Sequence, residues 1–206
     1  METFDETKIL LAMEGMPCWK RVAFMAYCCE RMLPNYRSFQ VDTGYGDVAP
    51  MRNALDAVWK WIEDGRAVPD LAVLASACEQ QSPDTAEFLS IYTSAALDAA
   101  TATAATLEAL ADATAKSVID VASLARDTID LFVQETEGLD PNDANLERRI
   151  IEHRLMQSEL RTQKESLALL RNLQEDREKV GVDLRARWSR LVQGSLPMAD
   201  GSGVTS

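Results

Sequence analysis

The sequence predicts an all-α fold, a multi-helix bundle with a central apolar helix and a long C-terminal helix. No segment alternates apolar and polar residues with the period of a β-strand. Apolar residues instead recur at helical spacing, in stretches that proline or glycine separates. We expect a single helical domain over residues 1–193 and a disordered tail over residues 194–206, where no apolar periodicity remains.

The expected central helix covers residues 17–33. It contains the uninterrupted apolar run 22–29, so most of its circumference is apolar, which is typical of a helix in the middle of a bundle. Pro34 is expected to break this helix, because proline removes a backbone donor and restricts the residue before it. A short helical piece over residues 35–43 should follow, and the glycines within residues 44–46 should allow a turn with positive φ.

The middle of the chain predicts further helices. Residues 48–64 form a strongly amphipathic stretch, with Asp47 as its expected N-terminal cap and Gly65 as its stop. Residues 69–81 repeat the pattern more weakly. Residues 93–136 are rich in alanine and threonine, which predicts one long helix or two consecutive, tightly packed helices.

The clearest loop covers residues 137–145, and Asp140 followed by Pro141 is the expected start of the next helix. Beyond the loop, an apolar stripe runs along a charged helix to Leu191. Gly181 is expected to bend or divide this helix.

The formal net charge of −12 opposes binding to nucleic acid and to anionic membrane surfaces. The charge is unevenly distributed, since residues 1–145 carry 10 Lys and Arg against 24 Asp and Glu, whereas residues 146–191 carry 11 against 8. Opposite charges on two parts of a chain favour their docking on each other, within a monomer or across a homodimer. A basic helix that binds nucleic acid is the alternative, which the acidic residues within that helix oppose.

The N-terminus is acidic where a signal peptide needs basic residues, and the longest apolar run is far shorter than a membrane span. We therefore expect a soluble, cytoplasmic protein. The four cysteines, Cys18, Cys28, Cys29 and Cys78, show no CxxC spacing. Reduced, buried thiols are the expectation, with no support for redox catalysis or a zinc site.

No catalytic set is recognisable. His153 is the single histidine, and no G-x-S-x-G or comparable nucleophile motif accompanies it. Ile150 stands where the Glu-x-x-His pattern of di-iron bundles requires glutamate. Asp98 is the least ordinary carboxylate, because Leu97 and alanines surround it and burial would require a partner. We predict no catalytic residues, no metal site and no cofactor.

The best candidate site is a polar corner formed by Glu30, Arg31, Asn35, Tyr36 and Asp47. Arg31 in a last helical turn would suit the helix dipole, and Asn35 would cap the short helix that follows. The pattern leaves two interpretations open. These side chains either form a closed network that locks a helix corner or line the rim of a binding pocket.

A dense set of distinctive residues surrounds this corner: Trp19, Phe24, Cys29, Glu30, Arg31, Met32, Pro34, Asn35, Tyr36, Phe39, Thr43, Gly44, Gly46 and Asp47. With them the chain resembles the YjaG-like family, a bacterial group of unknown function, and the resemblance continues more weakly to about Leu184. It implies an all-helical cytosolic protein without an established activity. It also implies an association with histidine-kinase signalling and supplies no catalytic residues.

Two functions are compatible with these observations. The leading hypothesis is a non-enzymatic interaction or regulatory protein that self-associates as a homodimer or binds a protein partner in two-component signalling. The alternative is a small-molecule-binding or hydrolytic protein that uses the polar corner.

Overall fold

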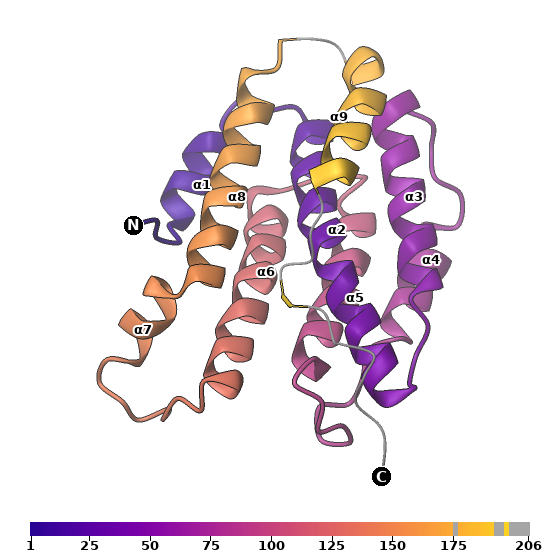
Figure 1. The fold of residues 1–206 in the computed structure, drawn as a ribbon. Coiled ribbons are helices and arrows are strands. Elements are labelled where there is room, and N and C mark those ends of the chain that lie inside the picture. Colours follow the sequence, from indigo (N-terminus) through magenta and orange to yellow (C-terminus); the bar gives the residue numbers. More distant parts are fainter. Residues whose placement is uncertain (175–176, 192–195, 198–206) are drawn as a thin grey trace.

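The computed structural model describes residues 1–174, 177–191 and 196–197 (Figure 1). Every secondary-structure element in these ranges is a helix, which confirms the predicted all-α class. In chain order the helices are α1 (Glu6–Met13), α2 (Cys18–Thr43), α3 (Ala49–Asp64), α4 (Leu71–Glu79), α5 (Thr93–Glu108), α6 (Ala115–Thr136), α7 (Leu146–Glu152), α8 (Arg154–Asn172) and α9 (Arg177–Leu191). None of these helices is both long enough and apolar enough to span a bilayer.

Helix α2 is the central element, as predicted, and it contacts α3, α5, α6, α8 and α9 (Figure 1). Residues 22–29 are all buried, because a run that is apolar on every side needs a cover on every side. Part of that cover is aromatic. Trp188 of α9 stacks on Tyr27 with ring centroids 4.4 Å apart, and its edge meets Trp59 of α3 at 5.9 Å.

The predicted break at Pro34 is wrong, because Pro34 lies inside a continuous α2. Proline removes one backbone donor from the helical ladder. Leu33, Asn35 and Tyr36 beside it are all buried, however, and tertiary packing of this kind outweighs a local penalty. The helix ends instead at Thr43, and Gly44, whose φ is 70°, is its C-cap.

The alanine-rich stretch forms two helices, α5 and α6, which is one of the two predicted arrangements. Most buried residues of α5 are alanine or threonine, and small side chains let α2 approach closely. The Cys29 Sγ atom of α2 accordingly lies 3.3 Å from the Thr106 hydroxyl. The hydroxyls of Thr103 and Thr106 donate to carbonyls one turn earlier at 2.7 Å, so they are satisfied within the helix.

The C-terminal part of the chain forms α7, α8 and α9, whereas the sequence predicted one long helix bent or divided at Gly181. Pro141 lies in a turn, and the next helix begins only at Leu146. His153 adopts an extended conformation that separates α7 from α8, and its Nδ1 atom accepts the Leu155 backbone N–H at 3.3 Å. Gly181, the expected dividing point, lies inside α9.

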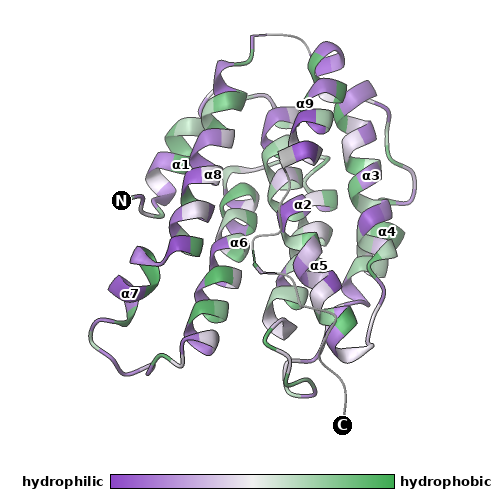
Figure 2. Cartoon of the chain, in the orientation of Figure 1, coloured by the Kyte–Doolittle hydropathy of each residue, from purple (hydrophilic) through white to green (hydrophobic). Residues whose placement is uncertain are grey.

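Charge complementarity within one chain joins the basic C-terminal region to the acidic remainder. Figure 2 shows a largely hydrophilic α9, and this helix packs on α3. Arg185 of α9 forms ion pairs with Asp56 and Glu63 of α3. The basic C-terminal segment therefore docks on an acidic helix of the same chain, which is the intramolecular one of the two predicted arrangements.

Two residues of the predicted tail contact the bundle. The Leu196 side chain is buried, and the Pro197 carbonyl accepts a hydrogen bond from the Tyr92 hydroxyl at 3.0 Å. The remainder of the predicted tail lies outside the described residues, and its disorder stays a prediction.

Gly181 allows the close packing of α9 on α3. A Cβ atom at this position would lie 2.8 Å from the Glu63 Cα atom. Backbone cannot move aside as a flexible side chain can, so a larger residue would push the two helices apart.

We expect Gly181→Ala to lower the free energy of unfolding by about 1–3 kcal/mol, measured by urea denaturation. An ordinary helical Gly→Ala change would stabilise by up to about 1 kcal/mol, so a stabilised variant would contradict the packing argument. Val182→Ala is the control, because Val182 is 57% exposed on the same helix.

Candidate functional site

The predicted polar corner does not surround one cavity. Neighbouring residues on a helix point about 100° apart, so the polar side chains of a continuous α2 reach different elements. Glu30 faces α3, Arg31 faces α8, and Tyr36 meets Asp47 in the loop before α3.

Glu30 joins α2 to α3. Its carboxylate accepts two hydrogen bonds from the Arg52 guanidinium, each 2.7 Å long, and one from the Trp59 indole at 2.8 Å. The Glu30 side chain is 12% exposed and that of Arg52 is 28% exposed. A two-point pair of this kind fixes orientation as well as distance.

Arg31 joins α2 to α8. Its guanidinium lies 2.5 Å from the Glu159 carboxylate, which is 1% exposed. Gln163, one turn further along α8, donates to the other Glu159 oxygen at 3.0 Å. The expectation that Arg31 serves a helix C-terminus is wrong, because α2 continues beyond it and the charge is paired laterally.

Tyr36 and Asp47 are the two corner residues that the fold brings together. The Tyr36 hydroxyl donates to the Gln81 carbonyl at 2.9 Å, and the Asp47 backbone N–H donates to the Gln81 side chain at 3.0 Å. Burial raises the pKa of Tyr36 to about 12. Gly46 has a φ of 78° and lies against the Tyr36 hydroxyl, so this turn requires glycine both for conformation and for space.

Neither predicted cap occupies the N-cap position itself. The N-cap of α3 is Val48, and Asp47, one residue earlier, accepts the Ala49 backbone N–H at 2.9 Å through its carboxylate. Asn35 is not a cap, since it lies in the middle of α2. Its side-chain oxygen accepts the Leu196 backbone N–H at 3.3 Å, which no sequence pattern indicated.

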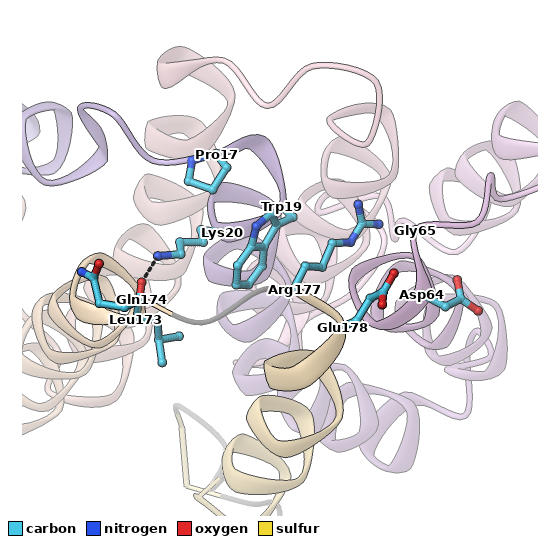
Figure 3. A pocket seen from close by; sticks show the side chains of 9 residues that line it. All are labelled: Pro17, Trp19, Lys20, Asp64, Gly65, Leu173, Gln174, Arg177 and Glu178. Atoms are coloured by element: carbon cyan, nitrogen blue, oxygen red, sulfur yellow. Dashed lines mark hydrogen bonds between the residues drawn. The ribbon is translucent and has the colours of Figure 1, made fainter.

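A cavity lies elsewhere, where the start of α2, the ends of α3 and α8 and the start of α9 meet (Figure 3). Its volume is about 560 Å³. Its lining side chains come from Pro17, Trp19, Lys20, Asp64, Leu173, Gln174, Arg177 and Glu178. Sequence reasoning missed this cavity, because its residues come from four separate segments without a shared motif.

The two cations of this cavity serve helix ends. Lys20 is buried and donates to the Leu173 carbonyl at 2.5 Å, just beyond α8 (Figure 3). Burial lowers the pKa of Lys20. Arg177 donates to the carbonyls of Trp61 and Ile62 in the last turn of α3, with its guanidinium 4.3 Å from the Trp61 ring. Cations at helix C-termini interact favourably with the carbonyls and the dipole of the last turn, which accounts for both side chains structurally; the Trp61 carbonyl also accepts the Gly65 backbone N–H at 3.0 Å.

The other candidates from the sequence lie apart from one another. His153 Nε2 is 3.5 Å from the Glu137 carboxylate, near the loop before α7. Asp98 of α5 accepts the Thr128 hydroxyl of α6 at 2.8 Å. Within the described part of the chain, no three or more His, Cys, Asp or Glu side chains are grouped so as to hold a metal ion.

The cysteines are free, and three of them are buried. Burial raises the pKa of Cys29 to about 12 and that of Cys78 to about 11, and it also raises the pKa of Cys28. Thiols with raised pKa values are poor nucleophiles. These side chains therefore pack as small apolar groups.

A family model described as a protein of unknown function (DUF416) matches residues 8–191. The chain belongs to the DUF416 family. The uncharacterized protein YjaG of Escherichia coli is 28% identical over 142 residues, which cover 68% of this chain and 72% of that protein. An uncharacterized protein of Haemophilus influenzae is 27% identical over 161 residues, 77% of this chain and 80% of that protein. The resemblance to the YjaG-like family is thus confirmed.

A solved structure shares the fold. The crystal structure of a DUF416 family protein from Shewanella baltica superposes with a TM-score of 0.83, covering 97% of this chain and all of that one at 20% identity. At this identity the likeness concerns the fold alone. The shared DUF416 architecture is therefore the helical bundle around α2.

We expect Glu30→Gln to lower the free energy of unfolding by about 1–3 kcal/mol, because Arg52 would lose its two-point charged partner and keep only the ion pair with the more exposed Asp56. Tyr36→Phe should cost about 1 kcal/mol through the hydrogen bond to Gln81. Urea denaturation measures both changes. Glu87→Gln, in the loop before α5, is the exposed control. Variants as stable as the parent would argue against a structural role.

Asp98 predicts a pH dependence of stability. Burial raises the pKa of its carboxyl to about 6, against an ordinary value of 3.8. Because the folded state holds the proton of this carboxyl more tightly than the unfolded state does, protonated Asp98 stabilises the fold. This stabilisation is complete below pH 3.8 and is lost as the pH rises through about 6. The loss amounts to about 2–3 kcal/mol.

We therefore expect Asp98→Asn to gain stability relative to the parent as the pH rises from 4 to 7, measured as the difference between their urea unfolding curves at each pH. Asp112→Asn, at an exposed position after α5, is the control for general charge effects. A difference between parent and Asp98→Asn that does not vary with pH would refute the assignment.

Proposed function

We propose that this protein is a non-enzymatic interaction or regulatory protein that binds its partner through an apolar patch at the end of α2. The patch consists of Tyr45, Phe88 and Leu89. Tyr45 is 39% exposed and Leu89, next to Phe88 in the chain, is 99% exposed, and this grouping of exposed apolar side chains is the observation that carries the proposal. Exposed patches of this kind mark interaction sites in soluble proteins.

The patch is anchored on a rigid aromatic cluster. The Tyr45 ring lies 4.8 Å from the Phe88 ring, and Phe88 meets the buried Phe39 of α2 edge to face at 5.3 Å. Phe88 thereby positions the neighbouring Leu89 outside the bundle. A rigid aromatic base lowers the entropic cost of binding, because fewer side chains have to be ordered.

A non-enzymatic role is supported by the way the polar corner is used. Glu30, Arg31 and Tyr36 each bind a partner within the chain, and these partners belong to different elements. The alternative of a small-molecule-binding or hydrolytic protein needs these groups to converge on one ligand. The observed contacts favour the closed network over the open pocket.

We propose a second copy of the chain as the partner of the patch, in a homodimer. A two-fold symmetric contact would bury the same leucine and tyrosine on both copies. The net charge of −12 disfavours nucleic acid and anionic membranes as partners. A cytoplasmic location belongs to the same proposal and is supported by the four free cysteines.

We expect the protein to form dimers at micromolar concentration in sedimentation-velocity experiments. Leu89→Asp should weaken the dimer at least tenfold, because it would place a charge in an apolar contact. Leu131→Asp is the matched control, since Leu131 is 46% exposed on α6, outside the patch. A strict monomer, or equal effects of both variants, would contradict self-association through this patch.

The association with histidine-kinase signalling rests on the family resemblance and is part of the proposal. We expect the protein to change the rate of phosphotransfer between a histidine kinase and its response regulator from the source organism, and Leu89→Asp to reduce that change. Radiolabelled phosphotransfer with purified components measures it. An unchanged phosphotransfer rate for every kinase and regulator pair of that organism would refute the signalling part of the proposal. It would have no bearing on the proposed dimer.

A further inference from the structure

An apolar groove with a volume of about 350 Å³ lies between the N-terminal segment with α1 and one side of α8. Its apolar lining comes from both walls, with Phe4, Ile9 and Ala12 on one side and Leu160, Leu167 and Ala168 on the other. A volume of this size is sufficient for a small organic ligand. The groove is lined by no residue of the patch or of the polar corner, although its Gln163 donates a hydrogen bond to Glu159, the ion-pair partner of Arg31.

The groove is elongated. Its α8 wall is the stripe Leu160, Gln163, Lys164, Leu167, Ala168 and Arg171, which recurs at helical spacing on one face. From Leu160 to Arg171 this stripe extends about 16 Å at 1.5 Å per residue. The shape therefore suits a linear ligand better than a compact one.

One cationic side chain at the groove has no ion-pair partner among the described residues. Lys8 pairs with Asp5 at 3.3 Å, and Lys164 pairs with Glu2 at 2.9 Å. Arg171 also lines the groove, and it makes no ion pair with any described residue. It lies in the last turn of α8, at one end of the apolar stripe.

We propose that this groove binds a medium-chain carboxylate, with its alkyl chain along α8 and its carboxylate on Arg171. The guanidinium offers the two-point geometry that a carboxylate prefers. The apolar walls would cover the chain, whose burial provides the main driving force. An extended ten-carbon chain, about 11 Å from its first to its last carbon from standard bond lengths, is shorter than the stripe.

Arg171 also has a simpler role available, since a cation in the last turn stabilises a helix through its dipole. That role predicts an effect on stability and none on ligand binding. The test therefore measures binding directly.

Isothermal titration calorimetry with decanoate, on the full chain, tests the proposal. We expect saturable binding that Arg171→Gln weakens about tenfold or more. Arg161→Gln is the matched control, because Arg161 is an exposed arginine of the same helix that does not line the groove. Ala168→Phe should abolish binding by filling the groove from an exposed position. Decyltrimethylammonium, with the same chain and the opposite charge, should bind at least tenfold more weakly.

Three results would overturn the proposal. One is the absence of saturable decanoate binding to a folded protein. Another is equal binding of decanoate and decyltrimethylammonium, which would indicate unspecific apolar adsorption. The third is a dimer that Ala168→Phe dissociates without any decanoate binding, which would make a second copy the occupant.

Discussion

Helix α2 is apolar on every side over residues 22–29, and covering it requires helices from several directions. Alanines and threonines of α5 let that helix approach α2 closely, while Trp59 of α3 and Trp188 of α9 fill the wider space on another side. The acidic α3 then receives the basic α9, with Gly181 in contact with the α3 backbone. The arrangement of the bundle thus follows from enclosing one helix.

Polar residues in the second half of α2 fix how the neighbouring helices are oriented around it. Glu30 and Arg31 are adjacent in sequence, and their ion pairs reach α3 and α8 respectively. Apolar contact alone permits neighbouring helices to slide or rotate, whereas charged pairs in a mostly buried setting are costly unless their geometry is met. Tyr36 fixes the loop after α4 in the same way, because its hydroxyl donates a hydrogen bond to the Gln81 carbonyl. The residues behind the family resemblance thereby orient the elements around α2.

With the polar corner occupied by internal contacts, the two surfaces that we propose for function are mainly apolar. The patch around Leu89 and the groove beside Arg171 occupy different elements, so variants at one leave the other intact. They also differ in kind. The patch is an outward projection supported by aromatic rings, whereas the groove is a channel with a surplus cation at one end. A macromolecular partner and a small ligand are therefore compatible on one bundle.

The sequence by itself determined the helical class, the central place of α2 and the glycine turn after it, because periodicity and glycine conformation act over a few residues. It also picked out Glu30, Arg31, Asn35, Tyr36 and Asp47 as a group. Only the tertiary structure decided that Pro34 stays helical, that His153 rather than Gly181 separates two helices, and that the polar corner serves several separate contacts. At Pro34 and in the polar corner, burial against distant segments outweighs local preference, whereas His153 acts as a local cap that accepts the Leu155 backbone N–H. Neither the partner of a side chain nor a groove between two helices is encoded in any short stretch.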